Sequence, residues 1–443
     1  MTDTLSVLSD LIGKARAAGA DEADAVLVSG ASLSVSVRQG KTEHLERSDG
    51  RDLGLRVFVG ARSAIVSSSS VDPSGFAALA ERAVSMAKVV PEDKFAGLAE
   101  TWAPPEAGDL DMADPYEPTP ELLTERARIA EEAAFAVKGI TNSEGGEAGY
   151  GRTEIALVTS AGFAGQRVGT SHSISATALA GTGTEMQRDY DYHGTVYFSD
   201  LDPPDVIGKS AAERALARLG PVRPKTGKMP VIFDPRVAGS LLGHFTGAIN
   251  GASVARGVSF LKDKLHQRVF APGISIHDDP RRIRGTRSRL FDAEGVPTRA
   301  RALVEDGVVT TWLLDSRSAR QLGMTSTGSA VRGTSGPPSP SATNLYLAAG
   351  TLTPAELMAD IKEGVYITEM IGMGVNGVTG DYSRGAAGFM IRDGALAEPV
   401  AEFTIASNLL AVFANLTPAN DLVFRRGTDS PTVRIEGMTV AGS

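Results

Sequence analysis

Histidine is the residue type in this chain with the best potential for metal chemistry, and His244 lies within a predicted helix. A catalytic zinc ion needs three protein ligands and an open position for water, together with a base that takes that water's proton. The other histidines have no second histidine at metal-binding spacing, and the chain contains no cysteine. The sequence therefore predicts no zinc site in this chain, and it favours a structural or interface role for His244.

A second candidate is the glycine-rich stretch 372–377, which has the G-x-G-x-x-G spacing of a phosphate-binding loop and follows a predicted strand over 365–371. A phosphate loop also requires a helix directly after it. The residues from Val378 onward show no apolar helical periodicity. The context therefore argues against a nucleotide site, and the chain has neither a P-loop nor a G-x-S-x-G motif.

Arginine is concentrated between positions 281 and 301, where acidic residues are interspersed with it. Mixed charges of this kind predict a solvated surface or an intersubunit ion-pair surface rather than a track for nucleic-acid phosphates. The acidic residues are Asp278, Asp279, Asp292 and Glu294. The arginines are Arg281, Arg282, Arg284, Arg287, Arg289, Arg299 and Arg301.

The helix that carries His244 has clear start signals. A short apolar strand, 231–233, is followed by Asp234 as a predicted N-cap and by Pro235 at the first helical position. The helix is predicted to run to about Asn250. Glycines four residues apart form a bare face on it, which another backbone can approach closely; they are Gly239, Gly243 and Gly247.

The chain has 443 residues, which is too long for one ordinary core and predicts two domains. We place them at 1–221 and 222–443. The first is expected to contain helices and antiparallel or mixed sheet, with an irregular, proline-rich surface excursion or lid at 92–119. The second is expected to be rich in sheet.

Local signals predict several further elements. A helix over 120–138 is expected to bury four apolar residues: Leu122, Ile129, Ala133 and Val137. Asp306-Gly307 and Asp393-Gly394 are predicted hairpin turns. Thr353 opens a capping box for a helix to Gly364, Ser407 is expected to start the last helix, and the polar stretch 325–343 is predicted to be a mobile loop outside the core.

Composition restricts the cellular setting. The net charge is −9 and there is no cysteine, so disulfides are excluded and nonspecific binding to nucleic acid or an anionic membrane is disfavoured. The N-terminus lacks the pattern of a signal peptide, and no apolar run approaches the ~20 residues of a membrane helix. We therefore expect a cytoplasmic protein.

Four segments together resemble the TldE (PmbA) family: the strand and helix at 229–254, FDAEGV at 291–296, TGDYSRGAAGF at 379–389 and the RIEGMTV ending. The resemblance extends over most of the chain. It implies an α+β fold of two domains, with a C-terminal domain of curved, mostly antiparallel, barrel-like sheet and few helices.

The sister family, TldD, resembles this one in fold and carries an H-E-x-x-x-H zinc motif on the corresponding helix, with a later cysteine as third ligand. When His244 is aligned with the second histidine, Gly239 occupies the place of the first and Ser240 the place of the general base. The resemblance thus implies no metal or catalytic residue here. It implies a TldD-type partner that holds the zinc.

The resemblance also gives the glycine-rich stretch a role in holding peptide, with four candidate contact residues: Asn376, Asp381, Tyr382 and Arg384. An equally open interpretation is a turn whose polar side chains satisfy their own backbone.

Three functions follow. The first is a non-catalytic subunit of a heterodimeric metalloprotease that cleaves unfolded peptides, as in microcin-precursor maturation and antitoxin degradation. The second is a homodimeric peptide-binding or regulatory protein, in line with the family's older label of DNA gyrase modulator. The third, and least favoured, is a self-sufficient hydrolase.

Overall fold

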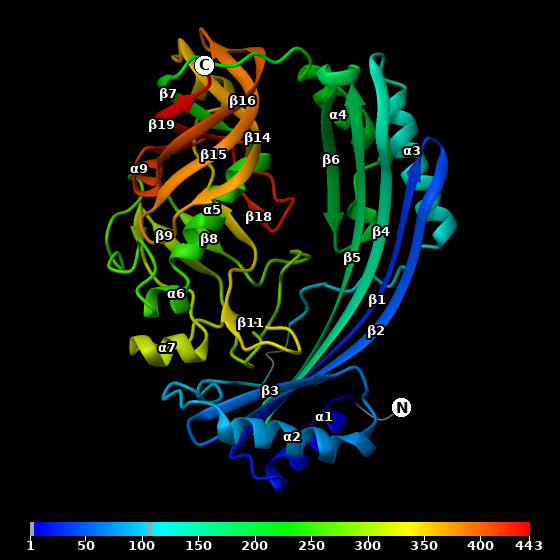
Figure 1. The fold of residues 1–443 in the computed structure, drawn as a ribbon, viewed down its shortest axis with the longest axis vertical. Coiled ribbons are helices and arrows are strands. Elements are labelled where there is room, and N and C mark those ends of the chain that lie inside the picture. The colour runs from blue at the N-terminus through cyan, green and yellow to red at the C-terminus, as the bar shows by residue number, and fades with distance from the viewer. Residues whose placement is uncertain (1–3, 105–107) are drawn as a thin grey trace.

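The structure is a computed structural model, and it describes residues 4–104 and 108–443. The N-terminal half is built on a six-stranded antiparallel sheet in the order β3-β2-β1-β4-β5-β6. Its long strands run up the full height of this half (Figure 1). The strands are β1 (Glu22–Arg38), β2 (Lys41–Val59), β3 (Arg62–Ser68), β4 (Ile140–Thr159), β5 (Ala164–Ala180) and β6 (Gln187–Thr195).

Two pairs of helices cover one face of this sheet at its two ends (Figure 1). Residues 23, 25 and 27 of β1 pack with the first pair, and residues 33, 35 and 37 pack with the second. Since alternate residues of a strand lie on the same side, both pairs cover the same face. The first pair is α1 (Thr4–Ala17) and α2 (Phe76–Val89), which follows the 3-10 turn η1 (Pro73–Gly75); the second is α3 (Pro120–Phe135) and α4 (Pro204–Ala217).

Helix α3 buries a different face from the one predicted. The expected core residues Leu122, Ile129, Ala133 and Val137 are only partly buried. The buried residues are mainly small: Leu123, Ala127, Ala130, Glu131 and Ala134.

Close backbone approach explains this choice of face. A Cβ atom added to Gly146 of β4 would lie 2.1 Å from the Ala127 carbonyl oxygen, and one added to Gly208 of α4 would lie 1.8 Å from that of Ala130. Only the alanine face of α3 allows the backbones to come so close. The short distance between the elements therefore decides which face of α3 is buried, although larger apolar side chains lie on another face.

We predict that Gly208→Ala destabilises the protein by about 1–3 kcal/mol, because the new methyl group overlaps the Ala130 carbonyl and forces α3 and α4 apart. Urea denaturation followed by circular dichroism measures the change.

Gly13→Ala is the matched control, since Gly13 also lies within a helix but has no atom within 4 Å of an added Cβ. This substitution is expected to be neutral or to stabilise by up to about 1 kcal/mol. Equal effects of the two substitutions would contradict the packing described for α3 and α4.

The C-terminal half is built on a closed barrel of five strands. The strand order is β16-β15-β14-β7-β19, and pairing of β16 with β19 closes the barrel. Strands β7 and β14 are parallel, while the other neighbours are antiparallel. The barrel strands are β7 (Gly227–Phe233), β14 (Glu363–Val375), β15 (Asp381–Arg392), β16 (Ala395–Asn408) and β19 (Val433–Ala441), and β17 (Leu416–Pro418) extends the sheet beside β19.

A second, smaller sheet lies beside the barrel in the order β10-β9-β8-β13-β18. Its strands are β8 (Ile276–Asp278), β9 (Arg301–Glu305), β10 (Val308–Val309), β13 (Leu345–Leu347) and β18 (Thr428–Asp429). The helices of this half are α5 (Pro235–Ala248), α6 (Gly251–Ala255), α7 (Ser316–Leu322), α8 (Pro354–Met358) and α9 (Leu409–Ala414).

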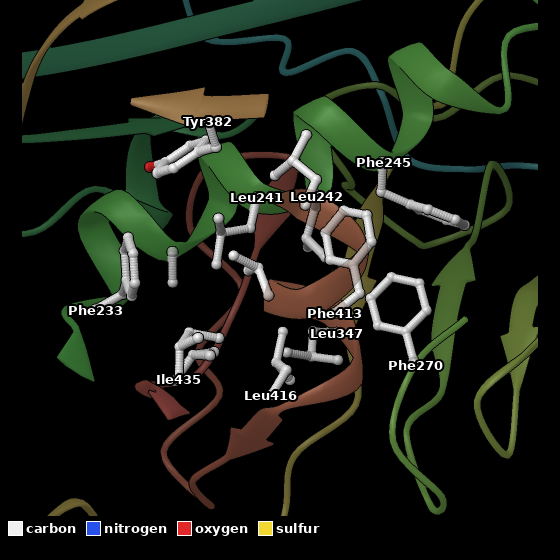
Figure 2. Packing of buried hydrophobic residues seen from close by; sticks show 14 of the residues in the cluster. Phe233, Leu241, Leu242, Phe245, Phe270, Leu347, Tyr382, Phe413, Leu416 and Ile435 are labelled. Carbon is white, nitrogen blue, oxygen red and sulfur yellow. The ribbon is translucent and has the colours of Figure 1, made fainter. Parts of the chain in front are cut away.

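One large apolar core joins these elements. Figure 2 shows Leu241 and Leu242 of α5 beside Phe413, with Leu416 and Ile435 below them. Phe270 stacks on Phe413 with ring centroids 4.5 Å apart. The α+β class and the barrel-like C-terminal sheet predicted from the sequence are confirmed.

Local signals placed most turns and caps correctly. Asp306 and Asp393 have positive φ angles of 44° and 46° at the two predicted hairpin turns. Thr353 forms its capping box. Residues 92–104 and 108–119 form no helix or strand, as expected, although Leu98 and Asp114 are buried.

Two predicted helix limits are wrong. The helix after Thr353 ends at Met358 instead of Gly364, because the carbonyls of Ile361 and Lys362 accept hydrogen bonds from the turn at 393–394. The last helix is capped by Asn408, not Ser407.

The polar stretch 325–343 was predicted to lie outside the core, and this is wrong. It contains β11 (Ala330–Val331) and β12 (Ser339–Pro340), and Ser329 and Thr343 are buried. Its Thr334 carbonyl lies against β2 so closely that a Cβ atom at Gly54 would be 2.2 Å from the oxygen.

Arg332 of this stretch completes a buried charge cluster between the two halves, which we define as Asp24, Arg56, Glu294 and Arg332. The Asp24 carboxylate accepts hydrogen bonds from both arginines, at 2.8 Å from Arg56 Nε. Glu294 Oε1 lies 3.8 Å from Arg56 Nη2. Burial favours the neutral form of Asp24, but the two arginines outweigh it and lower its pKa.

We predict that Asp24→Asn destabilises the protein by about 3–5 kcal/mol, since two buried guanidinium groups lose their shared carboxylate. Because the folded-state pKa of Asp24 is lowered, its contribution is present above about pH 4 and is lost as the pH falls below this. The difference between variant and wild type should therefore shrink in acid, which denaturation at several pH values measures.

Asp49→Asn is the matched control, because Asp49 lies on β2 with a 63% exposed side chain and pairs with the exposed Arg47. A change within about 0.5 kcal/mol is expected there. A loss of comparable size in both variants would contradict the role of the buried charge cluster.

No helix within 4–104 and 108–443 combines the length and the apolar character needed to cross a lipid bilayer.

Candidate functional site

The helix that carries His244 begins as the sequence predicts. The Asp234 carboxylate accepts a hydrogen bond from the Arg236 backbone N–H at 2.8 Å, and another from the Tyr366 hydroxyl at 3.0 Å. The guanidinium of Arg236 pairs with Asp189 of β6 at 2.6 Å. The start of α5 is therefore fixed both to the barrel and to the N-terminal half.

Gly239 and Ser240 make only contacts of packing and of local hydrogen bonding among those that the structure describes. A Cβ atom at Gly239 would lie 3.1 Å from the Thr428 carbonyl of β18, so a larger side chain requires this strand to move. The Ser240 hydroxyl donates to the Val237 carbonyl of its own helix at 2.6 Å. The geometry of this turn suits close packing.

His244 is partly buried, and its ring packs edge to face on Tyr382 with centroids 5.8 Å apart. Its Nε2 atom is buried and has no hydrogen-bond partner among the described residues. Burial lowers the pKa of His244, and the nearby positive charge of Arg384 lowers it further. The imidazole is therefore neutral at neutral pH.

Tyr382 and Arg384 lie on β15 beside His244. The Tyr382 side chain is buried, its hydroxyl contacts Met370 Sδ at 3.4 Å, and burial raises its pKa. Arg384 is partly exposed, and its Nε atom lies 3.4 Å from the Ile371 carbonyl oxygen. Of these two candidates, Arg384 has the more accessible polar group.

Asn376 and Asp381 make local hydrogen bonds. Asn376 Oδ1 accepts from the backbone N–H groups of Val378 and Thr379, at 2.9 and 3.2 Å. The Asp381 carboxylate accepts from the Thr379 hydroxyl and from Asn408. These contacts match the interpretation in which the polar side chains satisfy their own turn.

The end of the β14–β15 hairpin exposes apolar side chains next to this helix. The exposed fractions are 60% for Ile371, 85% for Met373 and 56% for Val378. Gly243 and Gly247 are also exposed on α5, with no atom within 4 Å of an added Cβ. The predicted close backbone contact therefore exists at Gly239 and not at the other two glycines.

Within residues 4–104 and 108–443, no group of three or more His, Cys, Asp or Glu side chains is arranged to hold a metal ion.

The arginine-rich stretch is not the solvated surface that its composition suggested. Asp278, Asp292 and Glu294 are each about 97% buried or more, and Arg289 is 8% exposed. Arg284 pairs with Asp111 and Asp200 of the N-terminal half. The carboxylates and Arg289 are buried because the stretch lies between the halves of the molecule, while Arg287 and Arg299 remain exposed.

Sequence reasoning missed the buried charge cluster. One signal was present, since Asp292 and Glu294 alternate with apolar residues in FDAEGV at 291–296. Such alternation is compatible with burial when the carboxylates find partners. Arg56, the partner of Glu294, lies too far away in the sequence to be recognised, as does Arg56's other partner Asp24.

The chain belongs to the PmbA/TldD family of metallopeptidases. Family models match three consecutive regions: PmbA/TldA metallopeptidase domain 1 at residues 23–87, the central domain at 113–219 and the C-terminal domain at 226–442.

Among its relatives is Metalloprotease PmbA of Escherichia coli O157:H7, which is 36% identical over 95% of this chain and 92% of that protein. The Metalloprotease PmbA homolog of Haemophilus influenzae is 33% identical over 93% of this chain and 90% of its own length. The family resemblance inferred from the four sequence segments is thus confirmed.

Solved structures agree with the fold. A protein of Bacteroides thetaiotaomicron, named as a candidate modulator of DNA gyrase, matches with a TM-score of 0.92 at 26% identity, and the match covers 100% of both chains. TldE from Thermococcus kodakarensis matches in fold, with a TM-score of 0.88 at 20% identity, covering 98% of this chain and 100% of that one.

We predict that His244→Phe keeps the stability within about 1 kcal/mol of wild type at pH 8, because an apolar ring replaces an imidazole whose Nε2 has no partner among the described residues. The lowered pKa of His244 means that the unfolded chain takes up a proton near pH 6.5 while the folded chain does not. Wild type therefore loses stability as the pH falls below this value, and the variant loses less.

Urea denaturation between pH 5 and 8, with zinc titration of both proteins, tests this. Tight zinc binding by the wild-type chain that His244→Phe abolishes would show that the imidazole is a metal ligand and would overturn the prediction.

Proposed function

We propose that this chain is the non-catalytic subunit of a heterodimeric metalloprotease, in which a TldD-type subunit provides the zinc ion and the general base. The main support is the geometry of α5. At the three positions where the sister family carries its zinc motif, Gly239 packs against β18, Ser240 bonds to its own helix and His244 packs on Tyr382.

The exposed surface beside α5 supports an interface with such a partner. Ile371, Met373 and Val378 present apolar side chains to solvent at the end of one hairpin. Contiguous exposed apolar groups on a soluble protein often mark a protein–protein contact. The bare glycines of α5 add a surface to which a partner's backbone can come close.

In this proposal the same region provides part of the wall that holds unfolded peptide. Arg384 is partly exposed, and the glycines at 372–377 leave room for an extended backbone. Asn376 and Asp381 would keep the turn in shape through their local hydrogen bonds. The substrates of the complex would be unfolded polypeptides, such as the microcin precursors and the antitoxin that the family processes.

A homodimeric peptide-binding or regulatory protein is the second candidate. It is favoured by the neighbour from Bacteroides thetaiotaomicron that is named as a candidate modulator of DNA gyrase. Such a protein would bind its target in cells that lack a TldD-type protein, whereas the first proposal requires both chains.

We predict that the purified chain alone neither holds stoichiometric zinc nor cleaves an unstructured peptide, and that cleavage appears when the TldD-type protein of the same genome is added. Metal analysis, molar mass by light scattering and cleavage of casein are measured for each chain and for the mixture. Zinc-dependent proteolysis by this chain alone would overturn the proposal.

Met373→Asp should weaken assembly by about tenfold or more, since it places a charge on an apolar contact. Val89→Asp is the matched control, because Val89 is 82% exposed at the end of α2, at the opposite end of the molecule (Figure 1). Equal loss of assembly in the two variants, or none in Met373→Asp, would exclude this surface as the interface.

A further inference from the structure

A cavity of about 670 Å³ lies between the two halves, away from α5. Its walls come from β4 and β5, from residues 108–113 and from residues 286–291. Backbone bonds join these walls: Thr170 N–H donates to the Met112 carbonyl, and Arg284 N–H donates to the Leu110 carbonyl, both at 2.9 Å. The volume is in the range that holds a small-molecule ligand.

Two arginines without a partner line this cavity. Arg289 is 8% exposed, and its Nε and Nη2 atoms are buried with no hydrogen-bond partner among the described residues. Arg167 of β5 likewise forms no hydrogen bond or ion pair with any residue that the structure describes. An unpaired guanidinium as buried as that of Arg289 is strongly unfavourable, and the partly exposed, unpaired Arg167 beside it adds a second positive charge, so the two indicate a missing anion.

The buried carboxylates closest to Arg289 are already engaged elsewhere. Asp278 Oδ1 accepts from the Thr343 backbone N–H at 2.7 Å and from its hydroxyl at 2.6 Å. The Asp292 carboxylate accepts from three backbone N–H groups at 2.8 to 3.0 Å. Neither carboxylate forms an ion pair with Arg289, although both lie close enough to influence it electrostatically.

The remaining acidic groups of the cavity are also occupied. Asp111 accepts from the Tyr197 hydroxyl and from Arg284, while Asp109 accepts from the Asp111 backbone N–H at 2.7 Å. The third arginine of the wall, Arg287, donates to the Thr428 hydroxyl at 3.2 Å. Among the described residues that line the cavity, the unbalanced charge is therefore positive.

Electrostatics agree with this geometry. Burial lowers the pKa of Arg167 to about 10, and the neighbouring Arg289 contributes to the same shift. The pKa of Arg289 is lowered by burial despite the two carboxylates. An anion between the two guanidinium groups would remove their mutual repulsion.

We propose that this cavity binds a small ligand through a carboxylate or phosphate group held between Arg167 and Arg289. Guanidinium groups bind both kinds of oxyanion through paired N–H···O bonds, which is the chemistry that the cavity offers. No residue of α5 lines this cavity.

The test is anion binding by the full-length protein in Tris chloride, with sodium chloride added to match ionic strength. Inorganic phosphate, citrate and an acetylated tripeptide with a free C-terminal carboxylate are titrated by calorimetry and by thermal denaturation. The amidated tripeptide distinguishes recognition of a peptide terminus from recognition of the other anions. At least one oxyanion is expected to raise the Tm in a saturable way.

Arg167→Met and Arg289→Met should each weaken that binding by about tenfold or more, since each removes a charged hydrogen-bond donor. Without anion, both variants should melt at or above the wild-type temperature, because an unpaired buried charge has been removed. Arg289→Lys keeps the charge but loses the paired geometry, and it should bind more weakly than wild type.

Arg152→Gln is the matched control, because Arg152 is an exposed arginine on β4 outside this cavity. It should bind like wild type. The proposal would be overturned if no oxyanion had an effect beyond that of chloride, or if all variants bound equally. It would also be overturned if both methionine variants had a lower Tm than wild type without anion, because the arginines would then be structural.

Discussion

The arrangement of the two halves depends on a charge interaction removed from water. Asp24 of β1 lies between Arg56 of β2 and Arg332 of the C-terminal half, and Glu294 adds a second carboxylate. Such groups are very unfavourable inside a protein unless each finds its partner. The two halves can therefore pack in one arrangement. In it, the stretch 325–343 contacts the face of the N-terminal sheet that helices α1 to α4 do not cover.

That arrangement also determines the other contacts between the halves. Arg236 at the start of α5 meets Asp189 of β6, and Arg284 meets Asp111 and Asp200. The helix α5, which carries Gly239, Ser240 and His244, is thereby held against the N-terminal half. Asp111 also lines the cavity that contains Arg167 and Arg289.

Features with local causes could be predicted from the sequence. Asp234 and Pro235 begin α5, and the turn at 393–394 joins β15 to β16, because caps and tight turns depend on a few adjacent residues. The absence of a zinc motif on this helix, which the resemblance implied from Gly239, Ser240 and His244, stays a prediction.

Features with distant causes could not be predicted. Arg332 and Asp24 are 308 positions apart, so no local pattern shows that the polar stretch is buried. On α3, large apolar residues suggested one face, yet glycines on β4 and α4 bring backbones so close that an alanine face is buried instead. Both errors arose because tertiary contact overrode composition.

The closed barrel also limits how a peptide can be recognised. Pairing of β16 with β19 closes the barrel, and β17 already occupies the place beside residues 433–435 of β19, so little of this sheet is left for an incoming strand to pair with. On the N-terminal sheet, the outer strand β6 has backbone carbonyls at Tyr190 and Tyr192 that already accept bonds from Arg236 and Arg425. At β6 and at the barrel, side chains and loop backbone are therefore more accessible to an extended chain than strand edges are.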